Sequence, residues 1–154
     1  MPDSSKAVGR ANPALRDLQP LVGRWTVTII WSKQTHKLIG GPPSVRGPAR
    51  FEWTHDGGFL VHTIGGEGTP IAHWMIGRDD SSGAFVVLYA DSRGVSRVYA
   101  MSLANNVWKI WRAAPGFHQR FSGRISSDRR SIEASWEKST DGKAWENDFD
   151  LAYT

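Results

Sequence analysis

The sequence predicts an all-β protein, a ten-stranded antiparallel up-and-down barrel with a short N-terminal helix. Apolar and polar residues alternate along most runs after Gly23, which is the period of a half-buried strand. Gly, Asp, Asn or Pro stands in almost every gap between these runs, and no helical period competes with them. Because closing such a meander removes its exposed strand edges, we expect a closed barrel.

The composition narrows the class of protein. A chain of 154 residues suits one domain, expected at 12–154 behind a disordered leader at 1–11. The net charge of +4 comes from scattered Lys and Arg, which does not favour nucleic-acid binding. There is no apolar run of ~20 residues for a membrane span and no signal-like start, so we expect a cytoplasmic protein. The lack of cysteine excludes disulfides and thiolate chemistry.

The first elements follow from caps and breakers. Asn12-Pro13 offers a helix cap and a first-turn proline, and Pro20 should end a helix that reaches about Leu18. Its leucines would plug one end of the barrel. A strand is expected from Trp25 to Trp31. The long connection at 32–48, rich in Gly and Pro, is expected to form a lid or binding loop.

Nine further strands complete the predicted barrel. They are expected at 49–54, 59–64, 71–77, 85–90, 95–103, 107–112, 117–125, 132–138 and 144–153. Turn residues then set the register, and the register sets which side chains face inward. Asn105-Asn106 suits a tight hairpin that pairs Met101 with Ile110. A turn at 91–94 pairs Tyr89 with Arg97 in the same way.

The last hairpins are aligned by their apolar faces. A two-residue turn at Asp141-Gly142 places Trp136 opposite Asn147, with Asn147 inside and Asp148 outside. The preceding strand then sets Arg120 opposite Glu137 on the outer face. Extending the register strand by strand toward the N-terminus predicts that Phe59, Val61 and Thr63 face inward.

These registers predict a cup with polar groups near one end. The polar inner residues are Thr63, Tyr89, Arg97, Tyr99, Arg112, Gln119 and Asn147. Because a buried guanidinium needs a partner, Arg97 and Arg112 would bind an anionic or carbonyl-bearing head group. The expected ligand-binding set is Trp31, Trp74, Tyr89, Arg97, Tyr99, Trp108, Arg112, Gln119 and Asn147.

Structural alternatives exist for each of these groups. The two guanidiniums could reach solvent or pair with Asp91, Gln119 and Asn147 could bond each other, and the tryptophans could be core. The predicted register also leaves an apolar strip outside, at Leu60, Ile64 and Met75. This strip either marks a homodimer contact or indicates a wrong register there.

Several motifs resemble those of a known superfamily. Leu21-Val-Gly-Arg-Trp25, which follows the short helix, resembles the Gly-x-Trp opening of lipocalins and fatty-acid-binding proteins, the calycin group. The segments 47–53, 58–61 and 76–79 resemble an uncharacterised bacterial lipocalin-like family. The resemblance implies a barrel with a cavity and no established substrate.

No metal or cofactor is expected. The haem-binding nitrobindin-like barrels need an inward histidine near the C-terminus, and no histidine follows His118. His62, His73 and His118 are predicted to face outward, which leaves no converging set of ligands.

The predicted function is the binding of a small hydrophobic or amphipathic molecule inside the barrel. The alternative is a cofactor-free isomerase or cyclase acting on a hydrophobic metabolite in the same cavity, stabilising an enolate through Arg and Tyr. A filled barrel that serves as an interaction module is the third possibility. A ligand that is bound and released unchanged favours ligand binding over the isomerase or cyclase. The absence of a cavity would favour the interaction module.

Overall fold

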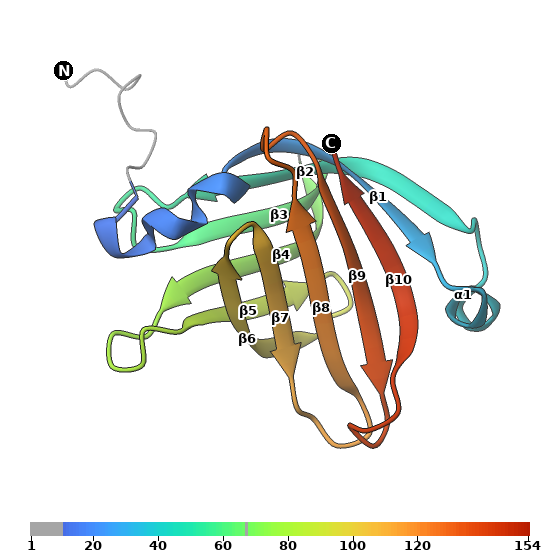
Figure 1. The fold of residues 1–154 in the computed structure, drawn as a ribbon. Coiled ribbons are helices and arrows are strands. Elements are labelled where there is room, and N and C mark those ends of the chain that lie inside the picture. The colour runs from blue at the N-terminus through green and yellow to red at the C-terminus, as the bar shows by residue number, and fades with distance from the viewer. Residues whose placement is uncertain (1–10, 67) are drawn as a thin grey trace.

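The computed structural model describes residues 11–66 and 68–154, and these form a closed barrel of ten antiparallel strands (Figure 1). The strands are β1 Gly23–Trp31, β2 Ser44–Trp53, β3 Leu60–Gly66, β4 Thr69–Arg78, β5 Phe85–Asp91, β6 Ser96–Ala104, β7 Val107–Arg112, β8 His118–Ile125, β9 Ile132–Ser139 and β10 Glu146–Tyr153. Each strand pairs with its neighbour in sequence, and β1 closes the ring on β10. The predicted fold class is confirmed. The expected leader lies outside the described residues except for Ala11.

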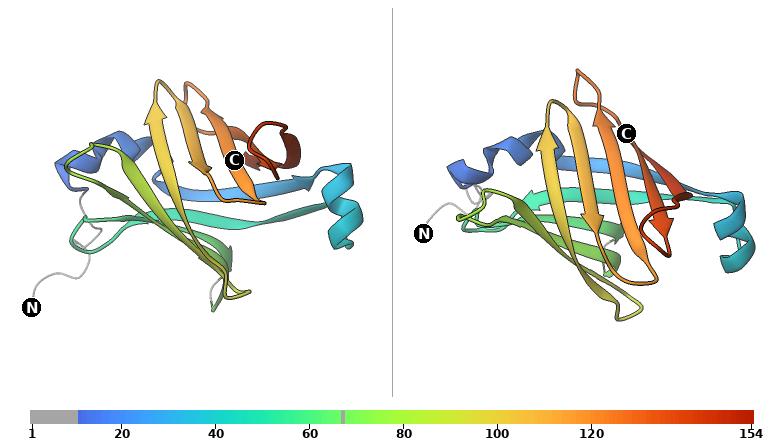
Figure 2. Two further views of the ribbon diagram at one scale, coloured as in Figure 1. Left: turned by 90° about the horizontal axis from the view of Figure 1, so that it is seen from below. Right: turned by 60° about the horizontal axis from the view of Figure 1, so that its bottom comes forward.

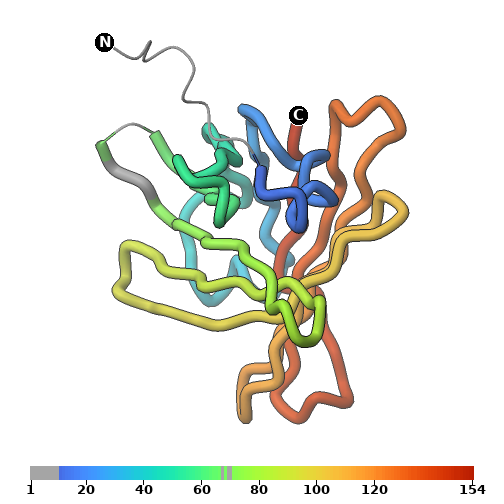
Figure 3. Tube along the Cα trace, turned by 90° about the vertical axis from the view of Figure 1, so that its left-hand side faces the viewer, coloured from blue at the N-terminus to red at the C-terminus, as the bar shows by residue number. Residues whose placement is uncertain are grey.

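The N-terminal helix covers one end of the barrel, as predicted. It is the 3-10 helix η2, Pro13–Leu21, and the Asn12 side chain accepts a hydrogen bond from the Ala14 amide at its start. The helix runs on past Pro20 and buries its leucines against the strands. The end that carries η2 faces the viewer in Figure 3. We call it the closed end.

The predicted long loop at 32–48 is wrong. Residues 33–39 form the helix α1, Lys33–Ile39, which Ser32 caps through a hydrogen bond to the Thr35 amide. Residues from Ser44 onward already belong to β2, where Ser44 pairs with Ile30. The connection is therefore short, and α1 sits where β1 ends and β2 begins (Figure 2). The prediction began β2 too late because the loop signal of Gly40-Gly41-Pro42-Pro43 was extended as far as Pro48.

Registers set by compact turns agree with prediction. Asn105 and Asn106 both adopt left-handed backbone angles, with φ of 53° and 60°, and Met101 lies opposite Ile110. On the outer face of β8 and β9, Arg120 pairs with Glu137, with the Nε and Oε1 atoms 3.0 Å apart.

The register of β3 differs from the prediction by one residue. His62 pairs with Phe51 and faces inward with Leu60 and Ile64, whereas Val61 and Thr63 face outward. Phe59 belongs to the turn, in which its carbonyl accepts the Thr54 amide at 2.9 Å. One further residue in the turn exchanges the two faces of the strand.

A β-bulge near the start of β10 changes the predicted inner face again. The Asp141 carboxylate accepts the amides of Lys143 and Ala144, so the connection is longer than a two-residue turn. The register shifts between Asn147 and Phe149, and the extra residue is Asp148. Asp148 is therefore buried. Asn147, expected inside, is exposed and donates to the Asp150 carboxylate on the outer face at 3.0 Å.

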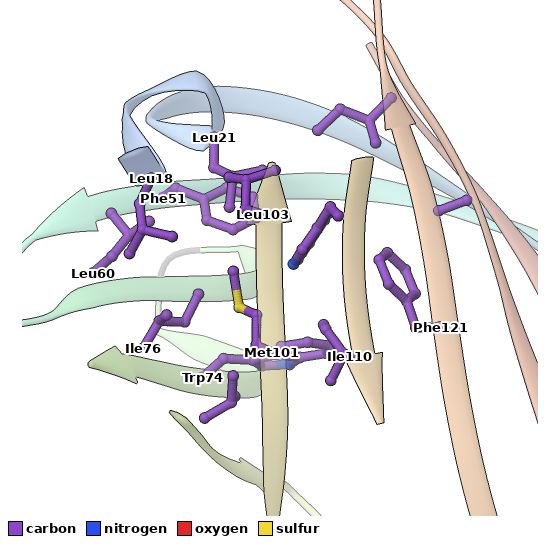
Figure 4. Close-up of a cluster of buried hydrophobic side chains, with 14 of the residues drawn as sticks. Leu18, Leu21, Phe51, Leu60, Trp74, Ile76, Met101, Leu103, Ile110 and Phe121 are labelled. Carbon is purple, nitrogen blue, oxygen red and sulfur yellow. The ribbon is translucent and has the colours of Figure 1, made fainter. Parts of the chain in front are cut away.

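Buried apolar side chains fill the interior of the barrel (Figure 4), and a connected set of them is aromatic. We call this set the aromatic core; it consists of Phe51, His62, Trp74, Tyr99, Trp108, Phe121, Trp136 and Tyr153. The Phe51 and His62 rings stack in parallel with centroids 3.9 Å apart. Leu18 and Leu21 of η2 pack onto the same cluster from the closed end. The interior is thus packed with rings rather than hollow.

His62 is the unusual member of this core. It is fully buried, and neither ring nitrogen has a hydrogen-bond partner among the described residues. Burial penalises the charged imidazolium and lowers the pKa of His62 from 6.5 to about 3. His62 is therefore neutral in the fold at neutral pH and protonates more readily when the chain unfolds.

We expect His62 to make the fold sensitive to acid. The pKa of His62 is lower in the folded state, so its contribution to the free energy of unfolding is complete above pH 6.5. As the pH falls from 6.5 toward 3, that contribution is lost by about 1.4 kcal/mol for each pH unit. His62→Phe keeps a ring on Phe51 and takes up no proton. Urea unfolding at a series of pH values should show that the free energy of unfolding of the variant rises relative to that of the wild type by this amount for each pH unit below 6.5.

The matched control is His55→Phe, in the exposed turn between β2 and β3. It should follow the wild-type pH dependence. A constant stability difference between wild type and His62→Phe from neutral to acid pH would contradict the buried neutral imidazole.

Candidate functional site

The end of the barrel opposite η2 gathers most of the predicted site residues. Here β1, β3, β5, β7 and β9 end and the even-numbered strands begin. We call the inward-facing side chains at this end the rim; they are Trp31, Tyr89, Arg97, Tyr99, Arg112, Gln119, Lys138 and Phe149. The predicted grouping of Tyr89, Arg97, Tyr99 and Arg112 at one end agrees with this geometry, and Gln119 joins them.

Arg97 and Arg112 enter the rim from neighbouring strands β6 and β7. Both are partly buried, and neither forms an ion pair with a carboxylate of the described residues. Their contacts are aromatic instead. The Arg97 Cζ lies 5.2 Å from the centre of the Phe117 ring, and the Arg112 Cζ lies 5.9 Å from that of Tyr99. Ring faces attract these cations, and both guanidiniums also interact with the Tyr99 hydroxyl.

The Tyr99 hydroxyl lies between the two guanidiniums. It donates a hydrogen bond of 2.9 Å to Oε1 of the buried Gln119 side chain. Burial raises the pKa of Tyr99, while Arg97 and Arg112 act in the opposite direction, because both positive groups lie near the phenolic oxygen. Gln119 bonds Tyr99 and not Asn147, which faces outward.

Asp91 is not the partner of either rim arginine. Its carboxylate binds Arg93, with Nη2 and Oδ2 2.7 Å apart, and accepts the Tyr89 hydroxyl at 2.6 Å. The bond from Arg93, together with the one from Tyr89, holds the pKa of Asp91 far below its usual range. Burial and this carboxylate raise the pKa of Tyr89. Asp91 is therefore already neutralised by Arg93 and forms no ion pair with Arg97 or Arg112.

On the other side of the rim, Lys138 is neutralised. Its Nζ lies 3.4 Å from Oδ1 of Asp148 and donates to the Thr35 hydroxyl at 3.1 Å. The Thr35 hydroxyl in turn donates to Asp148 at 2.7 Å, which ties α1 to β9 and β10. Sequence reasoning missed this cluster because it placed Asp148 outside. The polar run Glu146-Asn-Asp148 beside the turn was the available signal for an irregular strand.

The predicted tryptophans occupy different depths. Trp31 lies at the rim, with its ring edge-on to Phe149 at 5.0 Å. Trp74 forms the floor below it, parallel to Tyr99 at 6.4 Å between ring centres. Trp108 is fully buried toward the closed end, in contact with Phe121 at 4.6 Å, so it does not reach the rim.

Two hollows of the described residues lie away from the rim. The described residues form a hollow of about 240 Å³ beside β2 and one of about 190 Å³ over β4 and β5, and no rim residue lines either of them. No three His, Asp or Glu side chains converge as metal ligands within the described part of the chain. No helix that the structure describes has the length and apolar character needed to cross a membrane.

Comparison with known proteins supports the fold alone. No family model and no curated protein matches the sequence. The structure is similar to the crystal structure of Rv2717c from M. tuberculosis, with a TM-score of 0.57 and 18% sequence identity over 94% of this chain and 98% of that one. At this identity the likeness extends to the barrel and not to the side chains of the rim.

The cluster of Lys138, Asp148 and Thr35 should contribute measurably to stability. Lys138→Met keeps the apolar stem but leaves the Asp148 carboxylate, which is 13% exposed, without its cation. We expect a loss of about 2 kcal/mol in the free energy of unfolding, measured with urea at neutral pH. Glu52→Gln breaks the exposed pair with Arg50 and should cost under about 1 kcal/mol. Equal losses in the two variants would contradict the special role of the buried pair.

Proposed function

We propose that the rim binds the carboxylate, or a similar anionic head, of a small amphipathic molecule. The observation that carries the proposal is the pair Arg97 and Arg112, which forms no ion pair with a carboxylate of the described residues. A planar guanidinium offers parallel N–H donors that match a carboxylate, and partial burial strengthens such a bond. The Tyr99 hydroxyl adds a neutral hydrogen-bonding group between the two cations.

The apolar part of the ligand would lie across the rim and not deep in the barrel. The aromatic core fills the interior, with Trp74 and Trp136 6.1 Å apart below the rim. The ring faces of Trp31 and Phe149 are partly exposed and offer a shallow apolar wall. A short, flat hydrophobic body suits this wall better than a long acyl chain.

We also propose that the chain is a lipocalin-like barrel of the calycin group. Supporting features are the closed ten-stranded meander, the helix η2 over one end, and Gly23-Arg-Trp25 at the start of β1. The Trp25 indole donates to the Leu21 carbonyl at 2.9 Å and so fastens η2 to the barrel.

Binding is proposed in preference to catalysis. An isomerase or cyclase needs an inward group that can take up and return a proton. The two inward carboxylates at this end, Asp91 and Asp148, are each held by a cation and a hydroxyl. The enzyme alternative therefore has no free base among the described rim residues.

Arg112→Gln should weaken the binding of an aryl carboxylate by at least about tenfold, because one charge-assisted bidentate bond is lost. Binding of the corresponding primary amide should change little. Titration calorimetry or quenching of tryptophan fluorescence measures both. Arg124→Gln, on the exposed outer face of β8, is the matched control and should bind both ligands as the wild type does.

Equal losses for the acid and the amide would reject the carboxylate clamp. Mass spectrometry of molecules recovered after incubation with a hydrophobic metabolite extract separates the two functions. A ligand recovered unchanged supports binding, and a ligand recovered with altered mass or connectivity supports the enzyme alternative.

A further inference from the structure

One face of the barrel carries no charge. The outward-facing side chains of β3 to β6 are uncharged throughout the described part of these strands. We call this set the uncharged face; it consists of Val61, Thr63, Ile71, His73, Met75, Gly77, Val86, Leu88, Ala90, Ser96, Val98, Ala100 and Ser102. Charged side chains begin only at its borders, with Arg50 and Glu52 on β2 and Lys109 on β7.

Large apolar side chains concentrate on and beside this face. Six of the eleven exposed large apolar residues in the described chain lie here, with exposed fractions from 38% to 68%. They are Phe59, Ile71, Met75, Val86, Leu88 and Val98. Met75, Leu88 and Val98 lie directly opposite one another on β4, β5 and β6, so the cluster is continuous across strands. Contiguous patches of this kind mark interaction surfaces.

We propose that this face is a dimer interface that binds the same face of a second copy of the chain. A face without charge has no electrostatic complement to offer a charged partner. Its extent suits a weak self-association only. Four strands spaced by ~4.8 Å and seven residues rising ~3.3 Å each give roughly 400 Å² in plan. Two such faces total roughly 800 Å², less than the ~1,200 Å² of a stable interface, so the dimer is a weak one.

The face carries both a hollow and a projecting side chain. A hollow of about 190 Å³ lies among Phe59, Gly77 and Val86, where the Phe59 ring packs over Gly77. Ile71, on the same strand, is 60% exposed and projects beyond the hollow. A two-fold axis running across the strands between these positions would set each Ile71 over the hollow of the partner. Such reciprocal contact is the mark of an isologous dimer.

The test is the oligomeric state of the full chain by sedimentation velocity, from micromolar to submillimolar concentration. The wild type should associate reversibly to a dimer. Leu88→Asp should weaken association by at least about tenfold, because the carboxylate would be desolvated in the interface. Ile30→Asp is the matched control, since Ile30 is 50% exposed on β1 and Leu88 is 51% exposed. The control should dimerise as the wild type does.

Circular dichroism checks that each variant remains folded. If Leu88→Asp does not fold, Val98→Asp replaces it, because that side chain is 68% exposed and contributes least to packing. A wild type that stays monomeric at the highest concentration overturns the proposal, whether or not it then binds neutral lipid vesicles. A dimer that neither substitution weakens also overturns it.

Discussion

The packing of aromatic rings inside the barrel is the constraint on which the rest of the structure depends. A ten-stranded barrel is wide enough to enclose a ligand, but here rings from nearly every strand meet along its axis. Their mutual edge and face contacts hold the strands at fixed separations. A ligand that entered this region would have to displace rings from favourable contacts. Any chemistry that depends on exposed polar groups is therefore confined to the ends and the outer surface.

Charge is distributed unequally over the outer face of β8 and β9, the uncharged face of β3 to β6, and the rim. Outside, β8 and β9 carry basic and acidic side chains in register, as Arg120 and Glu137 show. The uncharged face of β3 to β6 lies on the other part of the same surface. At the rim, the cations are only partly matched by acids. Closure of the barrel makes this separation possible, since every strand contributes one residue to the inside for each residue it contributes to the outside.

The parts of the structure that were predictable from the sequence are those set by local turn chemistry. Asn105 and Asn106 adopt the left-handed angles of a tight turn, and the register of β6 and β7 follows from them. Where a turn is irregular, the alternation pattern alone does not settle which face is inside. One residue in the turn before β3 moved His62 into the core, and one bulged residue in β10 exchanged Asn147 and Asp148. Imidazole and carboxylate groups fit either face by polarity, so composition could not correct these errors.

The bulge at Asp148 also explains why the two sides of the rim differ. Because it inserts a carboxylate at the inner surface of β10, the ammonium of Lys138 on β9 is neutralised and α1 is held through Thr35. No corresponding irregularity occurs between β6 and β7, where regular pairing brings Arg97 and Arg112 inward beside Tyr99. An anion approaching the rim therefore meets a neutral side and a positive side whose guanidiniums form no ion pair with a carboxylate of the described residues. The position of the proposed head-group site thus follows from where the barrel is irregular, and not from the number of cations at its end.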